Sequence, residues 1–168
     1  APTADSYITN ATPTIKFTVT DADSGVNSGT IAMKLDGTAV TVTKTAITGG
    51  YECSYKPTTA LKDGSHTISV TASDNDGNAA SAKTATFTVD TVPPTLTITA
   101  PEEGLVTNKT TITVTGKTDD ATSKPVTVTV NGAAATVGTD GFFSKDVTLT
   151  NGANKITIIA KDKAGKTT

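Results

Sequence analysis

The sequence is poor in the residue types on which catalysis and nucleic-acid binding usually depend. Its 168 residues contain no Arg and no Trp, a single His (His66) and a single Cys (Cys53), and aromatic residues make up only 4%. Without arginine, and with a net charge of −2, the chain lacks the basic footprint of a nucleic-acid-binding protein. Its longest apolar runs are far too short to insert into a membrane. One cysteine cannot form a disulfide within the chain.

The scarcity of reactive side chains also argues against an enzyme. Catalysis needs a polarised group placed against a second one. The sequence shows no Gly-x-Ser-x-Gly turn, no glycine-rich phosphate loop and no His/Cys spacing typical of a metal site. Cys53 alternates with Tyr51 and Tyr55 and shares one strand face with them, so we expect a buried structural thiol there. Nothing in the sequence brings His66 to Cys53 as a base. We predict that the chain is not an enzyme and requires no cofactor.

What the sequence has in abundance is threonine alternating with Val and Ile. Thr14–Thr20 reads TIKFTVT, and Val126–Val130 reads VTVTV. Threonine is β-branched and half polar, so it suits the solvent face of a strand whose other face carries Val and Ile. A period of two is typical of half-buried strands, and no long segment shows helical periodicity. The sequence therefore predicts an all-β protein.

Two pairs of similar segments indicate that the chain is duplicated. Leu61–Asn78 (LKDGSHTISVTASDNDGN) aligns without a gap with Leu149–Lys166 (LTNGANKITIIAKDKAGK), 88 positions later. Phe17–Asp21 (FTVTD) matches Ile112–Gly116 (ITVTG) at an offset of 95. A repeat of this length indicates two whole domains rather than a solenoid of small units. We place the domains at residues 1–91 and 92–168, each just large enough for one core.

Turn-forming residues divide each domain into short strands, as in a β-sandwich. We expect strands near 3–8, 12–20, 30–35, 39–43, 50–56, 66–73 and 83–90, and then near 95–99, 110–116, 126–130, 133–137, 142–149 and 153–160. Asn131–Gly132 is the strongest hairpin signal. Pro93 and Pro94 predict a short, stiff linker that limits bending between the domains. Because only three residues follow Gly165, we expect the last strand of the second domain to be missing.

The chain resembles bacterial immunoglobulin-like domains. In the first domain the resemblance is carried by DGSHTISVTASDNDGN and DTVPPTLTI, which look like the domains strung in tandem through secreted and surface-anchored proteins. In the second it is carried by PEEGLVTNKTTITVTG, VTVTVNG and GFFSKDVTLTNGANKITIIAKDKAG, which are similar to Ig-like modules attached to bacterial glycoside hydrolases. The fold implied is two tandem Ig-like β-sandwiches joined by a Pro-Pro linker.

The same resemblance implies a role without catalysis. We expect a monomeric spacer or accessory module of a larger secreted or cell-surface bacterial protein, with neighbouring domains of the same polypeptide as its partners. The alternative is a carbohydrate-binding or adhesive module that contacts cell-wall or other polysaccharide. Sugar-binding surfaces need exposed aromatic rings. Phe143 faces the same side of its strand as Val147, which we expect to be the core side, so the neighbouring Phe142 is the one aromatic residue expected to point away from the core. A single ring is a weak platform.

Two acidic loops in the first domain are the candidate metal ligands. Asp21 and Asp23, and likewise Asp74 and Asp76, place carboxylates at alternate positions before a glycine. Calcium takes six to eight oxygen ligands, and such loops can supply several of them. In Ig topology the two loops lie at the same end of the sandwich, so the four carboxylates could face one another around calcium. The other interpretation is that Asp, Asn and Gly simply form turns there.

The corresponding acids of the second domain are Asp119, Asp120 and Asp162. Lysines surround them in the sequence, at Lys117, Lys124, Lys161 and Lys163. We therefore expect a metal site in the second domain to be less favourable than one in the first.

Overall fold

The computed structural model describes residues 2–168 and confirms an all-β chain of two Ig-like sandwiches. Contacts divide the chain into two compact units, Ala1–Asp90 and Thr91–Thr168. The division falls one residue before the boundary expected from the repeat. Within residues 2–168 there is no helix long and apolar enough to cross a membrane.

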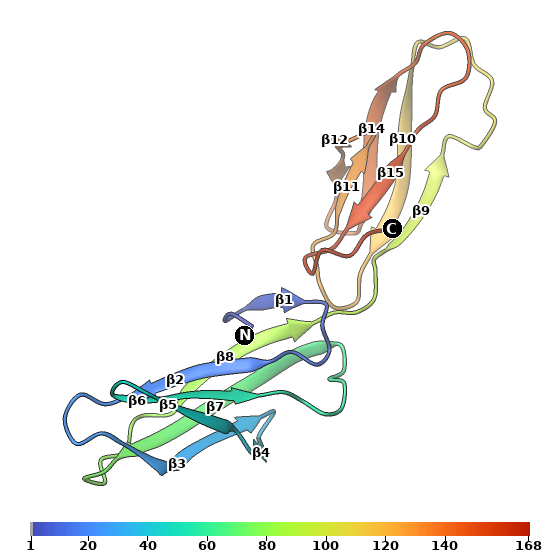
Figure 1. Ribbon diagram of the computed structural model, residues 1–168. Helices are drawn as coiled ribbons and strands as arrows, with labels where there is room; N and C mark the ends of the chain where they lie inside the picture. The colour runs from blue at the N-terminus through green and yellow to red at the C-terminus, as the bar shows by residue number, and fades with distance from the viewer. Residues whose placement is uncertain (1) are drawn as a thin grey trace. The chain divides into compact units, whose positions relative to one another are not determined.

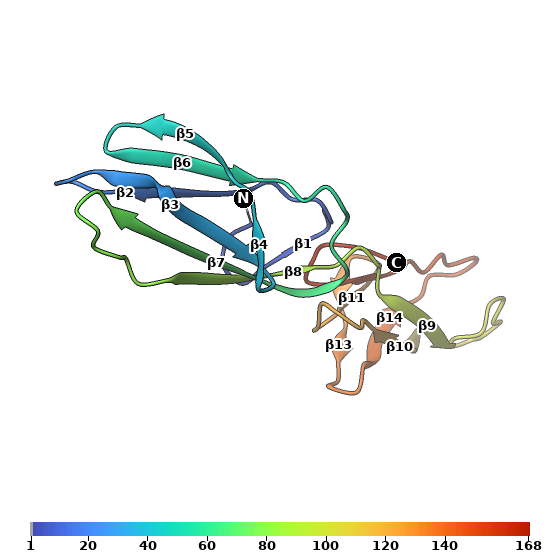
Figure 2. The same ribbon diagram turned by 90° about the horizontal axis from the view of Figure 1, so that it is seen from below.

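The first domain consists of two sheets that lie as separate layers (Figure 2). Its strands are β1 (Ser6–Ile8), β2 (Ile15–Thr20), β3 (Val26–Leu35), β4 (Thr38–Val40), β5 (Thr43–Ile47), β6 (Gly50–Tyr55), β7 (Gly64–Asp74) and β8 (Lys83–Val89). One sheet has the order β1-β8-β7-β3-β4 and the other the order β2-β6-β5. All neighbours are antiparallel except β1 and β8, which run parallel.

The core of the first domain forms where the inward-facing residues of the two sheets meet. Ile15, Met33 and Phe87 belong to its main buried cluster, and Cys53 belongs to a second cluster with Val26, Ile31 and Ala72. Cys53 is fully buried with a free thiol, as predicted, and burial raises the pKa of that thiol. Asp90, the last residue of the domain, is also fully buried, and its N–H donates to the carbonyl of Ile8 at 2.9 Å.

The second domain is also built from two sheets, and all of its paired strands are antiparallel (Figure 1). They are β9 (Thr95–Ala100), β10 (Thr111–Asp119), β11 (Thr127–Val130), β12 (Ala133–Ala134), β13 (Thr136–Val137), β14 (Phe142–Thr148) and β15 (Ile158–Lys161). The sheets have the orders β13-β14-β10-β9 and β12-β11-β15. Val114, Val128, Val130, Phe143 and Ala160 form the centre of the core.

Two hairpins follow from turn chemistry. Val130 pairs with Ala133 across Asn131–Gly132, whose φ values are 49° and 81°. Asp36–Gly37 joins β3 to β4 in the same way, with φ values of 50° and 80°. Both central residues lie in the left-handed region that a tight two-residue hairpin requires and that Asn, Asp and Gly tolerate. The hairpin predicted at Asn131–Gly132 is confirmed.

The structure corrects three strand predictions. The segment expected as one strand at 133–137 is divided into β12 and β13, which belong to different sheets. The segment expected as one strand at 39–43 ends at Val40, and a separate strand, β5, begins at Thr43 in the other sheet. All five residues of β5 are exposed, so this edge strand has no hydrophobic alternation by which to recognise it. The strand expected at 153–160 is regular only over Ile158–Lys161, although Ile156 still packs against the core.

The segment after β15 turns back along it. The N–H of Ala160 donates to the carbonyl of Thr168 at 2.8 Å, and the N–H of Thr168 donates to the carbonyl of Ala160 at 3.0 Å. Lys161 and Thr167 form an isolated bridge. The strand β15 therefore has β11 on one side and a pairing of only these few residues on the other.

Candidate functional site

The two acidic loops of the first domain lie side by side, as the Ig topology predicted. One follows β2 and the other follows β7. The N–H of Asn75 donates to the carbonyl of Gly25 at 2.9 Å, and its side-chain amide donates to the carbonyl of Ser24 at 2.8 Å. These contacts hold the loop of Asp21 and Asp23 against the loop that begins at Asp74.

The carboxylates in these loops bond to their own turns. Oδ1 of Asp21 accepts from the N–H groups of Asp23 at 3.0 Å and Gly25 at 2.8 Å. Both oxygens of Asp74 accept from Asn78, Oδ1 from its N–H and Oδ2 from its side-chain amide, each at 2.7 Å. The Asn78 side chain is the main reason why the pKa of Asp74 is lowered.

The four predicted ligands are not gathered at metal-binding distances in this arrangement. Asp23 and Asp76 are exposed, and Asp21 and Asp74 are half-buried. Within residues 2–168, no group of three potential ligand atoms at metal spacing includes any of the four. The loops are adjacent, but the carboxylates of Asp21 and Asp74 are used as turn acceptors.

The second domain contains the same turn as Asp74–Asn78, at Asp162–Lys166. In the first, the N–H of Asp74 donates to the carbonyl of Asn78 at 3.1 Å; in the second, Asp162 donates to Lys166 at 3.1 Å. Gly77 and Gly165 take nearly equal φ values of 88° and 93°. Oδ1 of Asp162 accepts from the N–H of Lys166 at 2.8 Å, just as Asp74 does from Asn78.

The two turns differ at the second carboxylate oxygen. Lysine has no side-chain amide to place where the Asn78 amide lies, and Oδ2 of Asp162 is buried with no hydrogen-bond partner in residues 2–168. Only 5% of Asp162 is exposed. The replacement of Asn78 by Lys166 therefore leaves a buried carboxylate oxygen unsatisfied.

A second buried carboxylate lies next to Asp162. Asp120 follows β10, is 6% exposed, and its Oδ1 accepts from the N–H groups of Thr122 at 2.8 Å and Ser123 at 2.6 Å. The N–H of Lys163 donates to the carbonyl of Ser123 at 3.2 Å and so joins the two loops. Ligand oxygens of Asp120 and Asp162 lie within 4.8 Å of each other. These buried acidic groups could hold a metal ion.

The sequence prediction ranked this region below the first-domain loops because of the surrounding lysines. Lys124 in fact pairs with Asp119 at 2.7 Å, and both of these side chains are exposed. That contact is the main cause of the lowered pKa of Asp119. The sequence feature that could have identified this site is the alignment of Lys166 with Asn78. It shows that the turn of the second domain has no side-chain amide to bond its aspartate.

His66 lies far from a catalytic arrangement. Its Nδ1 is 2.7 Å from Oδ2 of Asp36, and its Nε2 is 2.8 Å from the carbonyl oxygen of Lys62. Both neighbours can accept, so the imidazolium, which donates from both ring nitrogens, is the form that this site favours. Burial lowers the pKa of His66, but the hydrogen bonds to Asp36 and Lys62 and the charge of Asp36 outweigh it, so the pKa is raised.

Phe142 is exposed, as predicted. The residue is 55% exposed, and Nζ of Lys117 lies 5.1 Å from the ring centroid. The ring borders a shallow groove of about 360 Å³ whose other lining residues are Thr99, Thr115, Gly116, Thr136, Gly138, Phe143 and Ser144. The groove combines an aromatic ring with hydroxyl groups on β10 and β14.

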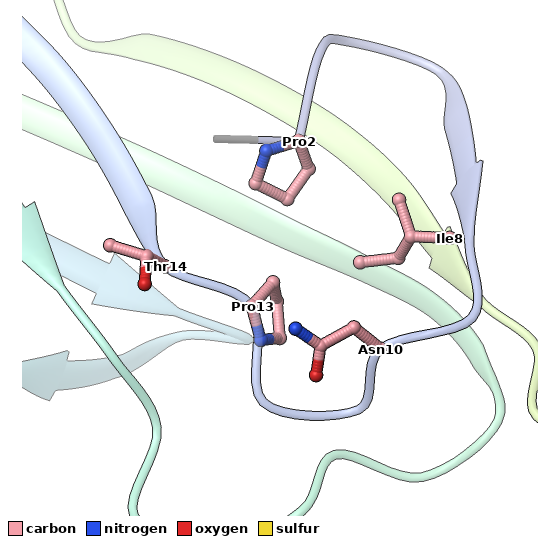
Figure 3. A pocket seen from close by; sticks show the side chains of 5 residues that line it. All are labelled: Pro2, Ile8, Asn10, Pro13 and Thr14. Carbon is pink, nitrogen blue, oxygen red and sulfur yellow. The ribbon is translucent and has the colours of Figure 1, made fainter.

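A second hollow lies in the first domain, beside β1 (Figure 3). It has a volume of about 300 Å³ and is lined by Pro2, Ile8, Asn10, Pro13 and Thr14. Figure 3 shows the two proline rings facing the side chains of Ile8 and Asn10. The lining contains no acid, base or thiol, so it offers no group for general acid–base chemistry.

Comparison with known proteins assigns each domain to a type of module. The profile of the bacterial Ig-like domain matches residues 1–91, and that of domain B of glucodextranase matches residues 94–168. Both profiles describe accessory domains rather than catalytic ones. The chain is 34% identical over 108 residues to bacillopeptidase F of Bacillus subtilis (strain 168); the match covers 64% of the chain but only 7% of that protein.

A solved structure supports the fold of the whole chain. The fibronectin(III)-like modules of CbhA from Clostridium thermocellum superpose with a TM-score of 0.55 at 19% identity. The match covers 99% of this chain and 86% of that chain. At this level of identity the similarity concerns the fold alone.

Proposed function

Since the chain belongs to the bacterial Ig-like domain family, we propose that it is a non-catalytic spacer or accessory segment of a larger bacterial protein at the cell surface or outside the cell. Its partners are the neighbouring catalytic, binding or anchoring domains of the same polypeptide, and the segment itself is monomeric. The observation that carries the proposal is the pairing of two Ig-like modules in one chain that matches only a small part of a much larger relative.

Distance measurements in solution test the spacer role. Fluorophores attached near residues 2 and 168, with Cys53 replaced by Ser to leave the labelling sites unique, should report a single narrow distance distribution. The Pro93–Pro94 linker is the physical reason, because two fixed φ angles restrict the joint. Replacing both prolines by glycine should broaden the distribution. A distribution equally broad in both proteins would contradict the spacer role, and so would dimers in sedimentation.

Carbohydrate binding is the second candidate function, and the exposed Phe142 ring favours it. The ring borders a groove lined by threonine and serine hydroxyls, which is the combination of an apolar platform and polar groups that ligand sites use. Binding of a polysaccharide in the micromolar range that is lost in Phe142→Ala would support this function. Leu105→Ala, which removes another exposed apolar side chain of the same domain, is the matched control. No binding across a polysaccharide panel would leave only the spacer role.

Calcium is not required by either function. The acidic loops of Asp21, Asp23, Asp74 and Asp76 remain a proposed calcium site of the first domain, supported by the contacts that hold the two loops together. Binding there would need the exposed Asp23 and Asp76 to turn towards Asp21 and Asp74.

A further inference from the structure

We propose that Asp120 and Asp162 form a calcium site within the second domain. The first observation is the buried oxygen Oδ2 of Asp162, which has no hydrogen-bond partner in residues 2–168. A buried polar atom without a partner is costly, and a charged one more so. A group outside the chain, such as a bound ion or an ordered water, can satisfy such an atom.

The second observation is the neighbouring carboxylate of Asp120. Ligand oxygens of the two residues lie within 4.8 Å, a separation that one calcium ion spans, since each oxygen would lie 2.3–2.6 Å from it. Neither carboxylate forms an ion pair in residues 2–168. Two like charges in a buried site repel each other, and a divalent cation between them removes both the repulsion and the unsatisfied oxygen.

The geometry of both side chains is set by their turns. Oδ1 of Asp120 is fixed by the N–H groups of Thr122 and Ser123, and Oδ1 of Asp162 by the N–H of Lys166. These bonds orient each carboxylate before any ion binds. The chain therefore offers preformed oxygen ligands, and carbonyl groups and water complete the coordination.

The ligand chemistry selects calcium. His66 and Cys53 both belong to the first domain, so the second domain has no nitrogen or sulfur side-chain ligand for zinc or copper. Magnesium demands near-ideal octahedral geometry, whereas calcium accepts irregular arrangements, and two carboxylates held by separate turns are irregular. For this pair of carboxylates we expect a Kd of about 10⁻⁴–10⁻³ M, the range of weak calcium sites.

The ion would join two loops that lie far apart in the sequence. The backbone bond from Lys163 to Ser123 already links the β10–β11 loop to the turn after β15. Calcium bound to Asp120 and Asp162 would strengthen the same junction. Calcium at a concentration of about ten times the Kd should raise the Tm of the second domain by about 5–10 °C.

Titration of the full chain with calcium chloride, followed by residue-resolved amide NMR, tests the proposal. We expect saturating shifts centred on Asp120, Ser123, Asp162 and Lys166, and weaker shifts with magnesium chloride. Asp162→Asn and Asp120→Asn should each raise the Kd at least about tenfold, because affinity follows the number of charged ligands. Asp146→Asn is the control, since Asp146 is an exposed acid of the same domain bonded to Thr113.

Three results would overturn the proposal. One is the absence of shifts at about 10 mM calcium, well above the expected Kd. Another is a set of shifts centred away from the two aspartates. The third is an affinity that both Asn variants leave unchanged. If one variant does not fold, the position of the wild-type shifts and the other variant still decide the question.

Discussion

The turns Asp74–Asn78 and Asp162–Lys166 occupy the same place in the two domains but satisfy their aspartates differently. In the first domain the carboxylate receives two hydrogen bonds from one asparagine, at its backbone and its side chain. In the second, the lysine supplies the backbone bond only, and the remaining oxygen is buried. In the same turn of the same fold, the carboxylate therefore has both oxygens hydrogen-bonded in the first domain, whereas in the second domain one oxygen can still accept a ligand.

A second pair of aligned residues, His66 and Asn154, also differs in chemistry, but here both residues contact the equivalent backbone carbonyl. His66 corresponds to Asn154 in the repeat. Nε2 of His66 lies 2.8 Å from the carbonyl oxygen of Lys62, and the side-chain amide of Asn154 donates at 2.8 Å to the carbonyl of Thr150, the residue aligned with Lys62. The backbone contact is conserved between the copies, but only the first domain has a titratable group there.

The largest expected difference between the domains is their response to pH. The folded pKa of His66 is raised, so its stabilising contribution is fully present below the unfolded pKa of about 6.5 and is lost as pH rises through the folded pKa. Hydrogen bonds to charged groups contribute about 1.5–3 kcal/mol, so the unfolding free energy of the first domain should fall by up to this amount.

Tyrosine fluorescence during urea unfolding measures this effect selectively, because Tyr7, Tyr51 and Tyr55 all lie in the first domain. Measurements at pH 6 and above pH 8 should differ in the wild type. His66→Asn, which copies the second domain, should remove the difference. An equal pH dependence in both proteins would show that another group is responsible.

The next prediction compares two aspartate substitutions in calcium-free buffer, which should change the unfolding free energies of their domains in opposite directions. Asp162→Asn should stabilise the second domain by about 1–3 kcal/mol, because it removes one of two adjacent buried charges and supplies a donor to the other. Asp74→Ala should destabilise the first domain, because Asn78 loses the acceptor for both of its donors. Amide signals followed through urea unfolding give both values. Destabilisation by Asp162→Asn would show that the second-domain carboxylate is already satisfied.

Much of this architecture was predictable because it depends on local patterns. Alternation of Thr with Val and Ile predicted most strands, and Asn131–Gly132 predicted its hairpin. The edge strand Thr43–Ile47 was not predictable, because none of its side chains is buried. The exposure of Phe142 and the burial of Cys53 were both predicted from the alternation of side chains between the two faces of a strand.

The acidic site was harder to predict because it depends on contacts between distant segments. Asp120 and Asp162 are brought together by the pairing of β11 with β15 and by the bond from Lys163 to Ser123. Charge in the sequence suggested the opposite, since lysines flank both aspartates. Lys124, for example, is exposed and pairs with the exposed Asp119 rather than with a buried carboxylate.

The smallest expected effect is calcium binding by the first domain. Calorimetric titration at millimolar calcium should give a weak signal that Asp76→Ala abolishes, because the carboxylates of Asp21 and Asp74 already accept hydrogen bonds. The titration is best done in Asp162→Asn, which weakens the second-domain site. A flat titration would mean that Asp21, Asp23, Asp74 and Asp76 only form turns.

Exchanging Asn78 and Lys166, the last residues of the two turns, tests the comparison between the domains most directly. In Lys166→Asn the new amide can bond Oδ2 of Asp162 as Asn78 bonds Asp74, so calcium affinity at the second domain should fall at least about tenfold although both carboxylates remain. In Asn78→Lys, water can solvate the more exposed Asp74, and no new calcium site should appear. Amide NMR titration of the two variants beside the wild type gives the answer. Unchanged calcium binding in Lys166→Asn would contradict the account.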